Sequence, residues 1–203
     1  MDKIILASSS PRRRMLLRQI GIPFDIIVGS AEEKMEPSTL PWDLVIELSR
    51  QKAEDVARGL GKGYLVIGAD TIVVHRNKIL GKPKDMDDAY SMISVLQGDM
   101  HEVYTGITLI KTSDNIIKSG FEKTEVHMRE LSPEIINAYI DTKEPMDKAG
   151  SYGIQGIGTL LIDKIHGDYN NVVGLPLKLL AALLGEIDIE LFNYITFKSQ
   201  ECE

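Results

Sequence analysis

The chain has 203 residues, 43% of them hydrophobic, which suits one large domain, or one domain with two lobes, built on a sizeable core. Its 30 acidic and 23 basic residues give a net charge of −7, which disfavours a broad surface for nucleic acid or for an anionic membrane. The one cysteine, Cys202, excludes an internal disulfide, and with no apolar membrane span or signal peptide in the sequence we expect a cytoplasmic protein.

The first predicted unit is a strand, a serine-rich loop and a helix. Residues 4–7 form a short apolar run typical of a buried strand. Ser10 is a favourable helix N-cap, and Pro11 suits the first position of a helix. Leu16 belongs to the apolar face of that helix, and Gly21 is a natural end for it.

Three arginines, Arg12, Arg13 and Arg14, fall in the first turn of this helix, where the helix dipole is already positive. The placement makes sense if an anion lies at the helix end, so we interpret the serine loop and the arginines as a phosphate site. Removing a contacting arginine should then relieve repulsion in the empty protein. The alternative is a solvated basic turn, and we expect at least one of the three to be a surface residue.

Residues 24–28 predict a second strand, and residues 30–41 a polar loop. Glu33 and its acidic neighbour in this loop are, on spacing alone, solvated loop charges. Residues 42–60 have the spacing of an amphipathic helix, with Lys52 on the apolar face. A lysine there either extends past the edge of the core or points into a cleft, and spacing alone favours the first.

Residues 64–69 read as a buried strand that resumes at 72–74, with Asp70 in between. A carboxylate within so apolar a run is costly to bury unless it is paired or bound to metal. Its small neighbours Gly68 and Ala69 should leave room for a ligand. We therefore favour a functional aspartate over one that makes a structural turn.

The middle and the end of the chain alternate between helical and strand patterns. The predicted elements are a hairpin turn at 76–78, a helix from 85 to 98, strands at 101–111 and 116–128, a helix at 132–143, a strand at 159–165, a turn at 166–171 and an apolar helix through 179–184. Beyond Gly185 both a helix and a strand stay open.

Residues 144–158 hold four glycines with polar residues between them, which indicates irregular backbone held close to another group. The segment lacks the Gly-Lys-Ser/Thr ending of a Walker A loop and the spacing of a dinucleotide-binding loop. The four histidines are scattered without metal-ligand spacing, and no serine hydrolase elbow is present.

Six short motifs, each weak alone, become specific through their order and spacing. They are Leu-Ala-Ser-Ser-Ser-Pro-Arg-Arg at 6–13, Gly-Ala-Asp-Thr at 68–71, Lys-Pro at 82–83, Tyr-Thr-Gly at 104–106, Glu-Pro-Met-Asp-Lys-Ala-Gly at 144–150 and Val-Val-Gly-Leu-Pro at 172–176. Together they resemble the Maf family, the septum-formation-inhibitor-like nucleotide pyrophosphatases, over nearly the whole chain.

The resemblance implies a single 1–203 domain with an elongated α/β fold, a mixed sheet with flanking helices, and a central cleft between two lobes, as in inosine-triphosphate pyrophosphatases. It implies hydrolysis of a nucleoside triphosphate between the α- and β-phosphates with a divalent cation, Mg²⁺ or Mn²⁺, and a homodimer. Residues 147–156 resemble members that act on dTTP and UTP, not those that act on 7-methyl-GTP. Removal of modified pyrimidine nucleotides and a link to cell-division arrest are further implications.

The resemblance also assigns roles to residues by their positions in the motifs. Asp70 is the catalytic acid/base; Arg12, Thr71 and Gln155 decide substrate choice; Ser8, Arg13, Lys52 and Lys82 bind phosphate; Glu33 and Asp70 bind the metal. A glutamine amide carries both a donor and an acceptor, so Gln155 can pair with the N3–H and a neighbouring carbonyl of uracil or thymine.

Two other classes of function compete with the enzyme. A non-catalytic nucleotide-sensing regulator of septum formation would use the same pocket to bind without turnover. A structural nucleic-acid-binding protein is disfavoured by the net charge.

Overall fold

The computed structural model describes residues 2–30 and 40–195. The described strands form one sheet: β1 (Lys3–Leu6), β2 (Asp25–Ile26), β3 (Tyr64–His75), β4 (Lys78–Leu80), β5 (Met100–Lys111), β6 (Ile116–Met128) and β7 (Ile162–His166). Their order is β2-β1-β3-β5-β6-β7, with β4 paired to β3. β1 pairs in parallel with β2 and β3, and the other pairs are antiparallel, so the predicted mixed sheet is confirmed.

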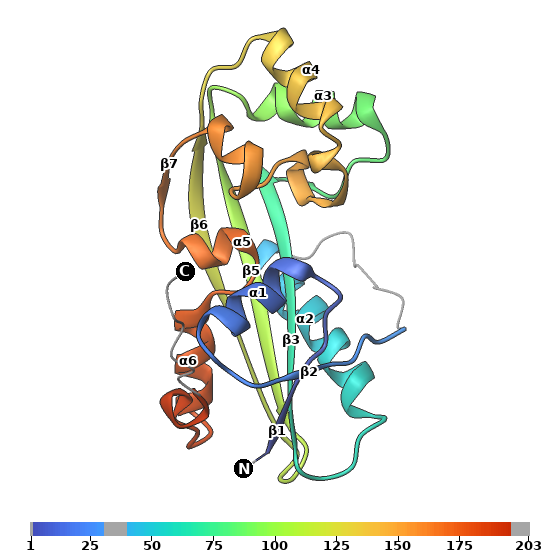
Figure 1. Ribbon diagram of the computed structural model, residues 1–203, viewed down its shortest axis with the longest axis vertical. Coiled ribbons are helices and arrows are strands. Elements are labelled where there is room, and N and C mark those ends of the chain that lie inside the picture. Colours follow the sequence, from blue (N-terminus) through green and yellow to red (C-terminus); the bar gives the residue numbers. More distant parts are fainter. Residues whose placement is uncertain (1, 31–39, 196–203) are drawn as a thin grey trace, which may run out of the picture.

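Helices flank this sheet in two groups. They are α1 (Pro11–Gln19), α2 (Pro41–Ala57), α3 (Met86–Leu96), α4 (Pro133–Asp141), α5 (Tyr169–Val173) and α6 (Leu177–Gly185). Figure 1 shows an elongated molecule in which β3, β5 and β6 run through most of the length. α1, α2 and α6 surround one half, here called the lower lobe, and α3 and α4 lie at the other half, the upper lobe.

Each lobe has a buried core of its own. In the lower lobe, Leu65 and Ile67 of β3 pack with α1 and α6, whereas Val66 between them packs with α2. In the upper lobe, Val73 of the same strand packs with α3 and α4. A strand covered on both faces needs apolar residues at successive positions, which explains the continuous apolar run at 64–69.

Two glycines bring the backbone of α2 into direct contact with the sheet. A Cβ at Gly68 in β3 would lie 2.2 Å from the carbonyl oxygen of Ser49, and one at Gly106 in β5 would lie 2.2 Å from that of Val45. Any larger residue would therefore push α2 off the sheet. The room expected for a ligand beside Gly68 is thus filled by α2. Gly106 pairs with Asp70 across the two strands, so this close approach places α2 beside the aspartate.

The edge of the sheet is interrupted beside Asp70. β3 pairs with β1 up to Ile67 and with β4 from Val73 onward. Between these two residues, β5 is the one described strand that pairs with β3. The edge of β3 that faces away from β5 is consequently unpaired with any described strand over a short stretch, which contains Asp70 and Thr71.

Most predicted elements are confirmed with small shifts at their ends, and three need correction. The expected strand at 159–165 begins only at Ile162, as β7, and its first residues belong to a 3-10 helix, Gly156–Leu161, at whose start Gly156 has a φ of 67°. The strand expected at 24–28 is reduced to β2. Beyond Gly185, the described chain adds a 3-10 helix, Leu191–Tyr194.

The turn expected at 166–171 also needs correction, because it runs into α5. Asp168 caps this helix by accepting a hydrogen bond from the Asn170 amide at 2.7 Å, and Gly174 ends it with a φ of 120°. A helix this short has a cap and a stop but no apolar periodicity. None of the described helices combines the length and the hydrophobicity that a bilayer crossing needs.

The contact of α2 with the sheet generates a stability prediction. Gly106→Ala should lower the free energy of unfolding by about 1–3 kcal/mol, because its methyl group meets the backbone of α2 and not a side chain that can rotate away. Urea denaturation measures the change. Gly61→Ala is the control, since a Cβ at Gly61 has no atom within 4 Å. Equal stability of the two variants would contradict this account of the packing.

Candidate active site

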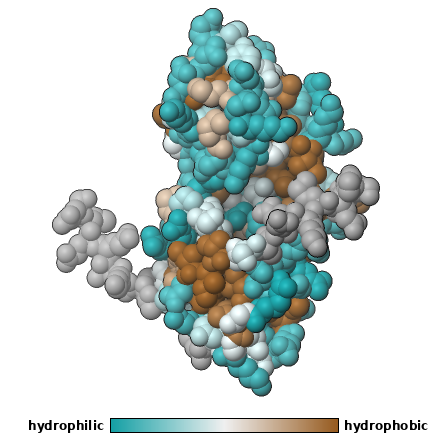
Figure 2. Space-filling model, turned by 90° about the vertical axis from the view of Figure 1, so that its right-hand side faces the viewer, coloured by the Kyte–Doolittle hydropathy of each residue, from teal (hydrophilic) through white to brown (hydrophobic). Residues whose placement is uncertain are grey.

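A cavity of about 810 Å³ opens at the interruption in the sheet edge, between the two lobes. The space-filling view shows the molecule hollowed at this waist (Figure 2). Every predicted site residue within the described chain lines the cavity: Ser8, Arg12, Arg13, Lys52, Asp70, Thr71, Lys82 and Gln155. Glu33, the second predicted metal ligand, lies outside the described residues. The volume is in the range of small-molecule sites, roughly 300–1,000 Å³.

Asp70 and Lys52 form an ion pair at the centre of this site. Asp70 is 8% exposed, and its Oδ1 accepts a hydrogen bond from the Lys52 ammonium group. This ion pair accounts for both unusual placements, that of a lysine on the apolar face of α2 and that of an aspartate within an apolar strand. Lys52 points into the cleft, which spacing alone did not predict. The close approach of α2 at Gly68 and Gly106 puts the lysine within reach.

Arg13 connects three separate parts of the lower lobe. Its guanidinium donates from Nε to the Gly174 carbonyl at 2.8 Å, from Nη1 to Ser8 Oγ at 3.1 Å and from Nη2 to Thr71 Oγ1 at 3.1 Å. The residue is 8% exposed. Because these bonds hold the serine loop, β3 and the end of α5 together, Arg13 is structural as well as cationic. With these bonds in view we expect the empty protein to lose stability without Arg13, whereas the helix-dipole argument from the sequence expected it to keep or slightly gain stability.

A chain of hydroxyl groups continues from Arg13 into the core. Thr71 Oγ1 lies 2.9 Å from Thr105 Oγ1, which donates to the Asn171 carbonyl at 2.9 Å. Each hydroxyl has one proton to donate, so Thr71 donates to Thr105 while accepting from Arg13. The Asn171 side chain in turn donates to the Val103 carbonyl at 3.0 Å. Motif matching included Thr105 but did not predict this role.

Arg12 crosses the cleft to the upper lobe. Its Nη1 lies 2.9 Å from Asp147 Oδ2, and Lys148 Nζ lies 2.7 Å from Asp147 Oδ1. Burial opposes ionisation of Asp147, but the hydrogen bonds from Lys148 and Arg12 outweigh it and lower the pKa of this carboxyl group. Arg14 does not line the cavity; it is half-buried and donates to the Ser9 carbonyl.

The sides of the cavity formed by the lower and the upper lobe are here called the lower and the upper wall. The upper wall also presents Lys82, which is exposed, and Gln155, which is half-buried. Neither side chain has a hydrogen-bond partner among the residues that the structure describes. Tyr152, which sequence reasoning missed, lines the wall and lies 2.6 Å from Nε2 of the buried His101. Burial lowers the pKa of His101 to about 4, so this histidine is neutral and supports the wall.

The described cavity lining is cationic although the whole chain has a net charge of −7. It contains five cationic side chains, Arg12, Arg13, Lys52, Lys82 and Lys148, and three anionic ones, Asp55, Asp70 and Asp147. A positive cleft on an acidic protein selects small anions over anionic polymers.

Fold and site together define an α/β protein with a cationic cleft at a break in the edge of its sheet. The chain belongs to the Maf-like protein family, whose model matches residues 3–187, so the family predicted from the sequence is confirmed. A dTTP/UTP pyrophosphatase of Alkaliphilus oremlandii is 51% identical over 194 residues, which cover 94% of this chain and 100% of that protein. A dTTP/UTP pyrophosphatase of a Thermoanaerobacter species is 51% identical over 190 residues, 93% of this chain and 99% of that protein.

Among solved structures, the Staphylococcus aureus Ham1 protein is similar with a TM-score of 0.46 and 15% identity, covering 95% of this chain and 93% of that one.

The bonds of Arg13 lead to a second stability prediction. Arg13→Ala should lower the free energy of unfolding by roughly 1.5–3 kcal/mol, because buried acceptors lose a charged donor. Arg18→Ala, an exposed position on the same helix, should change it little. Chemical denaturation of the nucleotide-free protein compares the two. A gain in stability for Arg13→Ala would restore the interpretation of Arg13 as a cation that only repels the helix dipole.

Proposed function

We propose that this protein hydrolyses dTTP and UTP between the α- and β-phosphates, releasing the nucleoside monophosphate and pyrophosphate. The observation that carries the proposal is the buried Asp70 carboxylate, held by Lys52 inside a cationic cleft. The relatives that are 51% identical over nearly their full length bear the name dTTP/UTP pyrophosphatase, which supplies the substrates. A cytoplasmic location belongs to the same proposal, because nucleoside triphosphates are cytoplasmic metabolites.

The lower wall is suited to the phosphates. A triphosphate brings about four negative charges, which guanidinium and ammonium groups and a helix N-terminus stabilise. Ser8 Oγ accepts hydrogen bonds from Arg13 Nη1 and from the Ser10 amide, at 3.1 Å and 3.2 Å. Both bonds use the oxygen, so the Ser8 hydroxyl proton stays available to a phosphate oxygen. Lys82 faces the same charges from the upper lobe.

Asp70 is the base in this proposal. Lys52 engages Oδ1, which leaves Oδ2 to orient a water molecule and accept its proton. The water oxygen bonds to the α-phosphorus, and the bond from that phosphorus to the bridging oxygen breaks. The electron pair of the broken bond goes to pyrophosphate, whose added charge the cationic side chains stabilise.

No cluster of three or more potential metal ligands exists among residues 2–30 and 40–195. Asp147 is already paired with Arg12 and Lys148. This fits Mg²⁺ or Mn²⁺ held by one or two carboxylates and the substrate phosphates, with Asp70 and Glu33 as the proposed ligands. When bound, the cation would lower the pKa of the attacking water and neutralise phosphate charge.

Gln155 is the proposed reader of the base. Uracil and thymine present a carbonyl and an N3–H, which match the donor and the acceptor of one amide. Cytosine reverses both partners, so a Gln155 amide that keeps one orientation would leave polar groups unpaired against it, and this rejects a ligand better than shape does. We therefore propose poor turnover of CTP. The homodimer and the link to cell division remain predictions.

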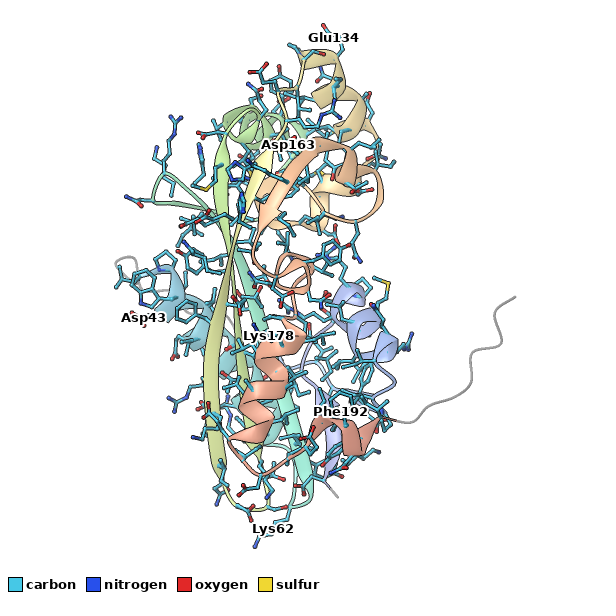
Figure 3. All side chains as sticks on the ribbon, turned by 90° about the vertical axis from the view of Figure 1, so that its left-hand side faces the viewer. Asp43, Lys62, Glu134, Asp163, Lys178 and Phe192 are labelled. Carbon is cyan, nitrogen blue, oxygen red and sulfur yellow. The ribbon has the colours of Figure 1, made fainter. Side chains whose placement is uncertain are left out.

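Asp70→Asn tests the catalytic role. The variant keeps the shape of the side chain but loses the proton acceptor, so turnover should fall at least ~10²-fold while the fold survives. Pyrophosphate release from UTP with Mg²⁺ measures turnover. Asp163→Asn is the control, because Asp163 is exposed on β7 and away from the cavity (Figure 3). Near-normal turnover by folded Asp70→Asn would refute the role, and tight UTP binding without turnover by the unaltered protein would favour the nucleotide sensor.

Gln155→Glu tests base reading. The carboxylate keeps the size of the amide but loses its donor, so the ratio of kcat/KM for UTP over CTP should fall by about tenfold or more. Gln19→Glu, an exposed change on α1, should leave the ratio unaltered. If the unaltered protein hydrolyses CTP as well as UTP, the assignment of Gln155 is wrong.

A further inference from the structure

Gln155 precedes the 3-10 helix Gly156–Leu161, and residues 153–158, which lead into and begin that helix, are here called the glutamine loop. Two residues outside the cavity hold this loop. Glu144 accepts hydrogen bonds from the Ile157 amide at 3.1 Å through Oε2 and from the Gly158 amide at 3.0 Å through Oε1. A carboxylate that binds two successive amides fixes the direction of the backbone between them.

Tyr139 holds the other end of the loop. Its hydroxyl accepts a hydrogen bond from the Gly153 amide at 3.2 Å and donates to Glu144 Oε1 at 3.1 Å. Burial and the neighbouring carboxylate raise the pKa of Tyr139, so the phenol keeps the proton that it donates. The loop is thus bound two positions before Gln155 and two and three positions after it.

The loop is packed tightly against this pair. A Cβ at Gly156, whose φ is 67°, would lie 2.8 Å from Glu144 Oε2. A Cβ at Gly158 would lie 2.8 Å from the Tyr139 hydroxyl and 2.2 Å from the Gly153 carbonyl oxygen. The glycines of the loop therefore serve its approach to Tyr139 and Glu144, in addition to any contact with a ligand.

We propose that Glu144 and Tyr139 are positioning residues that set the choice of base. They fix the loop on both sides of Gln155 and so aim its amide into the cleft. Neither residue lines the cavity, so an effect on base choice must act through the loop. Hydrogen bonds weaken steeply with misalignment, so a loosened loop loses the bonds that distinguish uracil from cytosine. The inference rests on the proposed role of Gln155.

Glu144→Gln is the principal test. A glutamine side chain has one accepting oxygen and an amino group, so it cannot serve all three donors that the carboxylate serves. The kcat/KM ratio of UTP over CTP should fall about tenfold, the equivalent of one hydrogen bond, with kcat/KM for CTP retained. If Glu144 served stability alone, its replacement would lower kcat/KM for UTP and for CTP together and leave their ratio unchanged.

Glu134→Gln is the matched control. Glu134 is exposed in the first turn of α4, the helix that also carries Tyr139, and lies at the far tip of the upper lobe (Figure 3). The Glu134→Gln substitution removes one negative charge from the same lobe, as Glu144→Gln does, but leaves the contacts of the glutamine loop in place. Tyr139→Phe is the second variant, because it deletes one hydroxyl and keeps the ring in the core should Glu144→Gln fail to fold.

Hydrogen exchange of the loop amides gives a readout that does not depend on activity. Exchange at Ile157 and Gly158 should accelerate in Glu144→Gln and stay unaltered in Glu134→Gln. An unchanged UTP over CTP ratio in Glu144→Gln and Tyr139→Phe, while Gln155→Glu lowers it, would overturn the positioning role alone. An unchanged ratio in Gln155→Glu would overturn the base-reading assignment and the inference with it.

Discussion

The site depends on one ion pair, between the half-buried Lys52 and the buried Asp70, at a break in the edge of the sheet. Such a pair is weak evidence for stability, since desolvation of two charges opposes their attraction and an apolar pair of similar volume is often at least as stable. Its position in an otherwise apolar strand and an apolar helix face therefore indicates function. The pair exists because Gly68 and Gly106 let the backbone of α2 lie directly on the strands.

Rigidity of the lower wall follows from a second interaction, the three-way bonding of Arg13. Through Gly174, Ser8 and Thr71 it ties the helix N-terminus to the strands, and Thr105 extends the network into the core. Groups held in this way lose little freedom when a ligand binds, which favours affinity. The upper wall is joined to the lower one across the cleft by the pair of Arg12 and Asp147.

Local pattern in the sequence predicted the long elements well, because strands such as residues 64–69 are apolar throughout and α2 has clear helical spacing. The same pattern also singled out Asp70, because a carboxylate is unusual within an apolar strand. The resemblance was needed to give roles to Lys52 and Gln155. The bonds of Arg13 escaped prediction because Gly174 is 161 positions away and Thr71 is 58 positions away. Short elements such as α5 escaped because caps define them and no periodicity does.

Phosphate binding and base reading, the two parts of the proposed substrate recognition, differ in how precisely the protein groups must be placed. Attraction between charges falls off slowly with distance and has little angular dependence, so lysines on flexible stems are adequate for phosphates. A hydrogen bond to a base edge fails when its angle is poor, so the amide that reads the base needs a fixed backbone. In our proposal Glu144 and Tyr139, which bind the backbone amides of Gly158 and Gly153 away from the cleft, fix that backbone. Changes in the glutamine loop can therefore alter base choice while the ion pair at Asp70, on a different lobe and a different element, stays intact.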